Sequence, residues 1–201
     1  MIAIVDYGAG NLFSVKNACD FLSLEAKVTS DALFIQKAEG IILPGVGAFP
    51  DAMKKLRQSN LITVLTEEAK KKPFLGICLG MQMLFDYSAE FEYTKGLSLI
   101  SGSVELMQTN GLKLPQIGWN DLTIERPSAL LEGICDRDYV YFVHSYAVMC
   151  EQQYILASTQ YGCTVPALVG NKTIFGAQFH PEKSGDVGLK ILKNFGKMVT
   201  G

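Results

Sequence analysis

Several features that would assign a chain to a specialised class are missing from this sequence. Acidic and basic residues nearly balance, with 20 Asp and Glu against 18 Lys and Arg, so the formal net charge is -2. We therefore expect neither nucleic acid nor a membrane surface as an electrostatic partner. No apolar run has the length needed to span a bilayer. The chain opens directly on an apolar segment, residues 2–5, without a basic leader, so we expect no signal peptide.

Cysteine is present, but not in a pattern that builds a disulfide framework. No Cys-x-x-Cys pair occurs, and the five cysteines are widely spaced: Cys19, Cys78, Cys135, Cys150 and Cys163. An odd and scattered set is untypical of small secreted domains that depend on disulfides. We therefore expect a reducing environment and place the protein in the cytoplasm.

Repeats, low-complexity tracts and linkers are also absent, so the simplest division is a single domain, residues 1–201. The first half alternates apolar strands with helical segments. Strands are expected at 2–5, 26–29, 40–43 and 74–77, and helices near 12–22, 51–57 and 61–71. This alternation predicts an α/β fold with an open, mainly parallel twisted sheet flanked by helices.

The pattern changes after about residue 95, where short strands follow one another with little helix between them. The expected strands are 104–107, 112–117, 122–125, 139–143, 154–158, 166–169 and 173–179. A short helix is expected near 128–133, and a final helix over residues 189–199. Such a series predicts antiparallel additions to the parallel sheet in the C-terminal half.

Two motifs are given ordinary interpretations. The glycine-rich turn at residues 6–11 follows the first strand, but Phe13 stands where a dinucleotide site needs its third glycine. We reject that site and expect Asn11 to cap the following helix. The run Lys70-Lys71-Lys72 is expected to be a solvated helix end and not a phosphate site.

The most informative stretch is Pro-Phe-Leu-Gly-Ile-Cys-Leu-Gly-Met-Gln at residues 73–82. Residues 74–77 fit a buried strand, and Leu79 begins a helical spacing of apolar residues that continues through Met83, Leu84 and Tyr87. Cys78 stands at the junction with a glycine two residues away on each side. This is the Gly-x-Ser-x-Gly nucleophile elbow with cysteine as the nucleophile, and a helix start favours the thiolate. Taken alone, the motif would more often be a buried structural cysteine.

A base for this nucleophile is expected in Gln178-Phe179-His180-Pro181-Glu182, which ends the last strong strand. A residue before proline is biased to extended backbone, and side chains two apart in an extended segment point the same way. His180 and Glu182 would then act as base and orienter. The commoner interpretation of an isolated His-x-Glu is a strand-ending histidine near a surface glutamate.

The carboxyl ends of parallel strands meet at one edge of a sheet. If their strands are neighbours, Cys78, His180 and Glu182 converge there as a cysteine-hydrolase triad for amides or esters. Acyl transfer also needs donors for the developing oxyanion. The amide of Leu79 is one candidate, and the loop Pro44-Gly45-Val46-Gly47 after another strand offers a second. A tight Pro-Gly turn is the plain alternative for that loop.

Taken together, these three motifs resemble those of the class I (triad) glutamine amidotransferases, and the resemblance covers essentially the whole chain. The shared motifs are Gly76-x-Cys78-x-Gly80-x-Gln82, Pro44-Gly45-Val46-Gly47 and His180-x-Glu182. Within that class, residues 6–11 and the segment Pro-Gln-Ile-Gly-Trp-Asn at 115–120 resemble the glutaminase subunits of imidazole glycerol phosphate synthases. Pyridoxal-phosphate synthase glutaminases share the triad but begin differently.

The resemblance implies that Cys78 attacks the side-chain amide of glutamine while His180, held by Glu182, transfers the protons. It implies oxyanion donors at Leu79, Val46 and Gly47. Glutamine contacts are implied at Gly45, Gln82, Glu90, Ser145 and Tyr146. No cofactor and no metal ion are implied, and His144 is given no catalytic role.

The resemblance also implies a partner. In the family a separate (β/α)8-barrel cyclase takes up the ammonia and forms imidazole glycerol phosphate for histidine biosynthesis, so a heterodimer is expected. Ammonia released into neutral water would become mostly ammonium and lose its nucleophilicity.

Other interpretations of the residues stay open. The same elbow could serve the glutaminase of another class I system, or a cysteine peptidase or small hydrolase. A sensor protein with an oxidisable Cys78 is a third possibility, although it leaves His180, Glu182 and Gln82 without a purpose.

Overall fold

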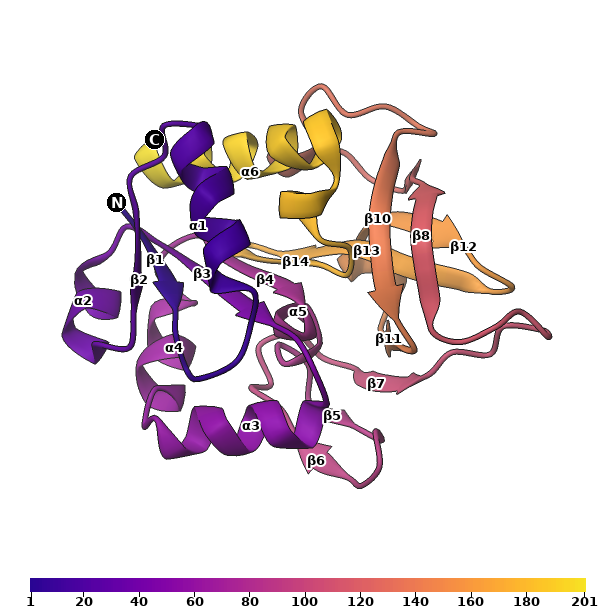
Figure 1. The fold of residues 1–201 in the computed structure, drawn as a ribbon, viewed down its shortest axis with the longest axis horizontal. Helices are drawn as coiled ribbons and strands as arrows, with labels where there is room; N and C mark the ends of the chain where they lie inside the picture. Colours follow the sequence, from indigo (N-terminus) through magenta and orange to yellow (C-terminus); the bar gives the residue numbers. More distant parts are fainter.

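A twisted eight-stranded sheet runs through the centre of the molecule, in a computed structural model that describes residues 1–201 (Figure 1). Five parallel strands come first in the spatial order, and three antiparallel strands complete it. In that order the strands are β2 (Ala26–Thr29), β1 (Ile2–Val5), β3 (Gly40–Gly45), β4 (Phe74–Cys78), β14 (Ile174–Ala177), β13 (Thr164–Asn171), β12 (Ile155–Gln160) and β9 (Thr123–Ile124). The expected parallel core with antiparallel additions is confirmed.

Helices cover both faces of this sheet. In Figure 1, α1 (Leu12–Phe21) and α6 (Gly185–Thr200) lie above it, and α3 (Phe49–Gln58) and α4 (Ile62–Glu68) lie below it. Alternate side chains of the central parallel strands enter opposite cores: in β1, for example, Ile2 and Ile4 join one cluster, whereas Ala3 and Val5 join the other. Burial on both faces explains why the parallel strands are almost uninterrupted apolar runs. No helix is both long and apolar enough to cross a membrane.

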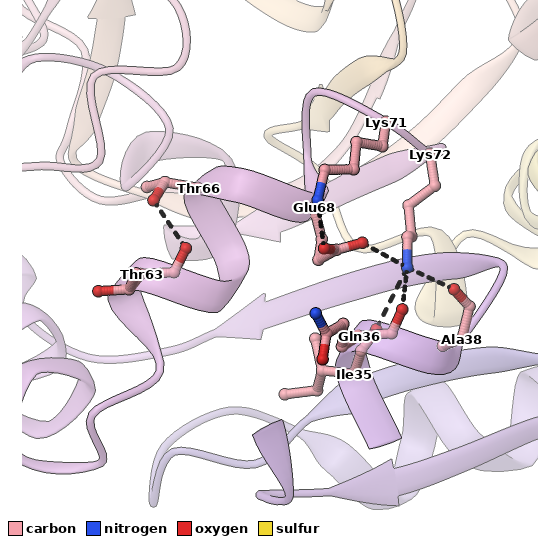
Figure 2. A network of polar contacts seen from close by, with 8 residues as sticks. All are labelled: Ile35, Gln36, Ala38, Thr63, Thr66, Glu68, Lys71 and Lys72. Carbon is pink, nitrogen blue, oxygen red and sulfur yellow. Dashed lines mark hydrogen bonds and ion pairs between the residues drawn. The ribbon is translucent and has the colours of Figure 1, made fainter. Parts of the chain in front are cut away.

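A short helix that the sequence pattern did not predict, α2 (Ala32–Lys37), is held by Lys72, which lies in the turn that follows α4 (Figure 2). The Lys72 ammonium donates to the carbonyl oxygens of Gln36 at 2.6 Å and Ala38 at 2.7 Å, and it pairs with Glu68 at 2.7 Å. These carbonyls end α2 and have no partner inside the helix. The lysine run is therefore not simply a solvated end, because Lys72 caps a neighbouring helix.

Two smaller sheets lie beside the antiparallel edge. A two-stranded ribbon, formed by β8 (Gln116–Asp121) and β10 (Tyr139–His144), pairs antiparallel. A second sheet contains β11 (Tyr146–Met149), β7 (Ser103–Leu106), β5 (Tyr87–Ser88) and β6 (Thr94–Lys95). Short 3-10 turns complete the chain as η1 (Ala129–Leu131), η2 (Gln152–Tyr154) and η3 (Pro181–Lys183). The strand expected at 112–117 begins only at Gln116, after a turn in which the Leu112 amide donates to Thr109.

The helix expected after Cys78 is much shorter than its apolar spacing suggested. It is α5 (Leu79–Gln82), and Tyr87 already belongs to a strand. The reason lies in the loop at residues 97–100. Its amides donate to the carbonyl oxygens of Met83, Leu84 and Phe85, which a longer helix would have used internally.

Candidate active site

Three neighbouring strands bring the predicted site together at their carboxyl ends. β4 pairs in parallel with β3 on one side and with β14 on the other. Cys78 ends β4 in register with Gly45 of β3, and Ala177 of β14 is in register with Ile77. The condition set by the sequence, that these strands be neighbours, is met. Cys78, the predicted oxyanion loop (residues 45–47, the oxyanion loop below) and the segment that leads to His180 therefore share one edge of the sheet.

Cys78 occupies a strained backbone conformation between its two glycines. Its φ is 55° and its ψ is -112°, a region that residues with a side chain rarely adopt. A methyl group on Gly76 would lie 2.6 Å from the carbonyl oxygen of Gly80, and one on Gly80 would lie 1.8 Å from that of Leu43. The turn is therefore tight enough to exclude any side chain at both positions. This is the strand-to-helix turn expected of a nucleophile elbow.

His180 and Glu182 form a buried pair behind this sulfur. The imidazole Nδ1 lies 2.8 Å from Oε1 of Glu182, and the two side chains are 3% and 1% exposed. The predicted contact is present, and His180 is extended as expected before proline, but the extended backbone does not continue to Glu182. Glu182 lies in the turn η3, which returns the carboxylate toward the ring.

The charges around His180 favour its protonated form. Burial alone would lower its pKa, but the Cys78 sulfur and the Glu182 carboxylate outweigh burial and raise the pKa of His180 to about 9. With Nδ1 directed to Glu182, the other ring nitrogen is left to face the sulfur. The pair can therefore hold a proton next to Cys78 and deliver it to a leaving group.

A second polar group on the sulfur escaped the sequence analysis. Gln178 is fully buried, and its Nε2 donates to the Cys78 sulfur at 3.9 Å. Its side-chain oxygen accepts from Nε2 of Gln82 at 3.0 Å, which fixes the orientation of both amides. Gln178 precedes His180 by two residues, so the period-two spacing that paired His180 with Glu182 could also have found it.

Gln82 also fixes the opposite wall of the site. Its Nε2 donates to the carbonyl oxygen of Tyr146 at 2.9 Å, and that carbonyl is also bonded by Nδ1 of His144 at 2.9 Å. Burial lowers the pKa of His144 to about 4, so the ring is neutral and Nδ1 is the donor. His144 therefore supports the backbone at residues 144–146.

A cavity of about 490 Å³ opens over the sulfur. Most of the predicted contact residues line it, namely Val46, Gly47, Leu79, Gln82, Glu90, Ser145 and Tyr146, together with Cys78 and His180. Gly45 does not: it is the buried last residue of β3, where an added methyl would lie 2.7 Å from the amide nitrogen of Gly80. Its position fits close packing under the elbow and gives no support to a contact with substrate.

Glu90 is the one acidic residue among those that line the cavity. Its Oε2 accepts from the amide of Phe49 at 2.7 Å, where α3 begins just after the oxyanion loop. Burial raises the pKa of Glu90, although the Phe49 amide opposes that change. No group of three or more His, Cys, Asp or Glu side chains is arranged to hold a metal ion.

Comparison with known proteins gives close relatives over the whole chain. The model of the family "Glutamine amidotransferase class-I" matches residues 3–199. A Caldanaerobacter subterraneus subsp. tengcongensis protein named "Imidazole glycerol phosphate synthase subunit HisH" is 50% identical over 201 residues, covering 99% of this chain and 98% of that one. The Oceanobacillus iheyensis protein of the same name is 49% identical, with 99% and 100% covered. A Listeria monocytogenes protein of that name is 49% identical, with 97% and 94% covered.

Solved structures share the fold at lower identity. One described as "Crystal structure of glutamine amidotransferase" has a TM-score of 0.78 and 18% identity, and covers all of both chains. Another, "Structure of PurLQS from Thermotoga maritima", has a TM-score of 0.75 and 19% identity, with 96% of each chain covered.

Proposed function

The chain belongs to the class I glutamine amidotransferases, and we infer that it is the glutaminase subunit of an imidazole glycerol phosphate synthase. It releases ammonia from glutamine for a synthase partner in histidine biosynthesis. The observation that carries this proposal is that Cys78 and His180 line one cavity, with Glu182 bonded to His180 behind it, in a chain about half identical to the HisH subunits.

The proposed reaction uses only groups of this chain, glutamine and water. The Cys78 sulfur bonds to the side-chain amide carbon of glutamine while His180 holds the thiol proton. Amides of the oxyanion loop and of Leu79 stabilise the charge on the carbonyl oxygen. As the C–N bond breaks, His180 gives the proton to the departing ammonia. Water then attacks the thioester, returning the thiol and releasing glutamate, so no cofactor is required.

The cavity lining suits the amino-acid end of glutamine. Glu90 supplies a carboxylate for the α-ammonium group, as the charge of that group demands. Both amide hydrogens of Gln82 are used within the protein, so its oxygen remains as an acceptor for the substrate. Backbone groups at Ser145 and Tyr146 complete the proposed contacts. Glu90→Gln should raise the KM for glutamine more than it lowers kcat, and an unchanged KM would remove Glu90 from this role.

The proposed partner is a (β/α)8-barrel cyclase, and its docking face surrounds this cavity. One face of the ribbon exposes large side chains, with Ile117 62%, Trp119 55% and Tyr139 55% exposed. The turn at residues 6–11 lies beside the oxyanion loop, because a methyl on Gly10 would lie 3.3 Å from Pro44. Asn11 caps α1 through the Ser14 amide and lies in that turn. We place the complex in the cytoplasm, on the strength of the unpaired cysteines.

We further propose that the partner switches the glutaminase on through the oxyanion loop. Gly47 has a φ of +97°, and glycine reaches backbone angles that other residues avoid, so reorientation of the Val46–Gly47 peptide is easier there than at a residue with a side chain. A peptide turned away leaves the oxyanion with one donor fewer, a loss typically of ~100- to 1,000-fold in rate. Interface contacts that hold the peptide inward would restore that rate.

The test measures glutamine hydrolysis by the chain alone, with the barrel subunit, and with the barrel plus its ribotide substrate. We expect a rise confined to the full complex, and a smaller one in Gly47→Ala, where positive φ is disfavoured. Gly45 is unsuitable for this test because an added side chain there would strike α5. Equal rates in all three states would refute the switch, and no hydrolysis in any state would refute the proposed function.

A further inference from the structure

A closed set of hydrogen bonds joins the main chain of His180 to the ribbon. The amide of His180 donates to the carbonyl oxygen of Tyr141 at 3.0 Å. The amide of Tyr141 in turn donates to the Ser184 hydroxyl at 2.9 Å, and that hydroxyl donates to the carbonyl oxygen of His180 at 2.6 Å. Both main-chain polar groups of the proposed base are therefore held, and Ser184 takes part in two of the three bonds.

These bonds occupy the free edge of β10. Tyr141 lies opposite Trp119 of β8, and both of its main-chain groups bond to the turn. In an antiparallel pair, such a residue directs its amide and carbonyl away from the partner strand. The turn at residues 180–184 thus takes the place that a third strand would occupy. The serine hydroxyl supplies the acceptor that a strand carbonyl would otherwise provide.

Ser184 has little freedom to do anything else. It is 1% exposed and does not line the cavity. It lies at the junction of η3 and α6, and a methyl group on Gly188 would lie only 2.7 Å from its β-carbon. Its hydroxyl is the acceptor for the Tyr141 amide, whereas the His180 carbonyl also receives the Lys183 amide at 3.0 Å. Loss of the hydroxyl would therefore leave the Tyr141 amide of the ribbon without its acceptor, whereas the His180 carbonyl would keep the Lys183 amide.

We propose that Ser184 is a positioning residue for the base, an inference that rests on the proposed glutaminase function. Glu182 fixes the imidazole ring at Nδ1, and Ser184 fixes the main chain that carries the ring. The two constraints together hold the remaining ring nitrogen on the Cys78 sulfur. Neither constraint alone sets the distance between nitrogen and sulfur, because the ring moves with its main chain.

Ser184→Ala should lower kcat for glutamine by about 10- to 100-fold, since a displacement of about 1 Å in a reacting group can cost 100-fold. The KM for glutamine should change little, because Ser184 lies outside the cavity. Ser158→Ala is the matched control, because Ser158 is also 1% exposed and its hydroxyl donates a hydrogen bond to Glu125 at 2.6 Å. Ser158 lies in β12, a strand whose residues do not line the cavity. Ser184→Thr, which keeps the hydroxyl, should retain most of the activity.

The experiment uses the complex with the barrel subunit and three readouts. Glutamine-dependent synthesis should fall in Ser184→Ala, and synthesis from added ammonium should not. The rate of Cys78 alkylation by iodoacetamide, followed by peptide mass spectrometry across pH 5 to 10, should show a shifted midpoint in Ser184→Ala only. Thermal melting records any general loss of structure in all variants.

The outcomes separate the inference from the function on which it rests. A Ser184→Ala enzyme with kcat within twofold of the original and an unchanged alkylation profile overturns the positioning role. An equal loss of glutamine- and ammonium-dependent synthesis shows a merely structural serine and also overturns it. If the unaltered complex hydrolyses no glutamine, the proposed function fails, and the alkylation profile still decides whether Ser184 positions His180.

Discussion

The proposed nucleophile, Cys78, and its proposed base, His180, are positioned by two regions of different construction. Cys78 ends β4, a strand of buried residues with a parallel neighbour on each side and apolar cores above and below. His180 lies beyond the end of β14 in a turn that polar contacts hold to the ribbon. The first region is fixed by packing and the second by hydrogen bonds.

This difference separates stability from catalysis. A change around Cys78 disturbs close packing in the centre of the sheet, so it should cost folding free energy as well as activity. A change in the turn at residues 180–184 removes polar contacts beyond the carboxyl end of β14. It should cost activity while leaving most of the folding free energy in place, because the apolar cores are untouched.

The largest expected effect comes from removing the nucleophile itself. Cys78→Ala should abolish glutamine-dependent synthesis in the complex, because no thioester can form, and synthesis from added ammonium should continue. Product formation from each nitrogen source measures this directly. Loss of both activities in a complex that still assembles would contradict the assignment of Cys78 as a nucleophile used only for ammonia release.

The next effects lie on the base side of the comparison. His180→Ala should slow formation of the thioester by at least about 100-fold, the usual contribution of general acid–base catalysis. Glu182→Gln should be milder, because it removes an orienting group and keeps the base. Single-turnover release of ammonia from the complex measures both. A Glu182→Gln variant slower than His180→Ala would reverse the proposed roles.

A stability comparison tests the packed side. Gly80→Ala should lower the free energy of unfolding by about 1–3 kcal/mol or more, because the added methyl meets the carbonyl oxygen of Leu43 at 1.8 Å. Gly111→Ala is the control, since Gly111 has a positive φ of 93° but open space around it. Its expected cost is only the backbone strain, about 1–2 kcal/mol. Urea unfolding measures both variants. If Gly80→Ala lost no more free energy of unfolding than Gly111→Ala, the elbow would be less tightly packed than described.

The last prediction is a pH dependence of stability that originates at the proposed base. Folding raises the pKa of His180 from about 6.5 in the unfolded chain to about 9. Protonated His180 therefore stabilises the fold, fully below pH 6.5, and this contribution is lost as pH rises through 9. The difference in free energy of unfolding between the unaltered chain and His180→Ala should therefore shrink as the pH rises from about 6.5 to about 9. A difference that grew with pH would show that the ring is held neutral.

The sequence predicted the packed region better than the polar one. The mainly parallel sheet and the elbow followed from runs of apolar residues and from motifs at strand ends, and so did the approach of His180 to Cys78, on the condition that their strands are neighbours. The contact between His180 and Glu182 was predicted correctly, but on an extended geometry that η3 replaces. The helix after Cys78 was overestimated, because apolar spacing cannot reveal that a distant loop takes the carbonyl groups.

Other features depend on long-range hydrogen bonds, which leave no periodic signal. Lys72 caps α2 from more than thirty residues away, so a lysine run looked like a solvated end. Ser184 depends on the approach of β10, and that strand is distant in sequence. The helix α2 is only six residues long, too short for a hydrophobic period, although Asp31 caps it through the Leu33 amide.

Covalent labelling by an electrophilic glutamine analogue, such as a diazo-ketone, tests the central claim most directly. Intact mass and peptide mapping of the complex should show one adduct, on Cys78, formed more slowly when glutamine is added. The adduct should be absent from Cys78→Ala and slow to form in His180→Ala. Labelling of other cysteines in place of Cys78, or a rate that glutamine does not change, would contradict the account of this cavity as a glutamine site with Cys78 as its nucleophile.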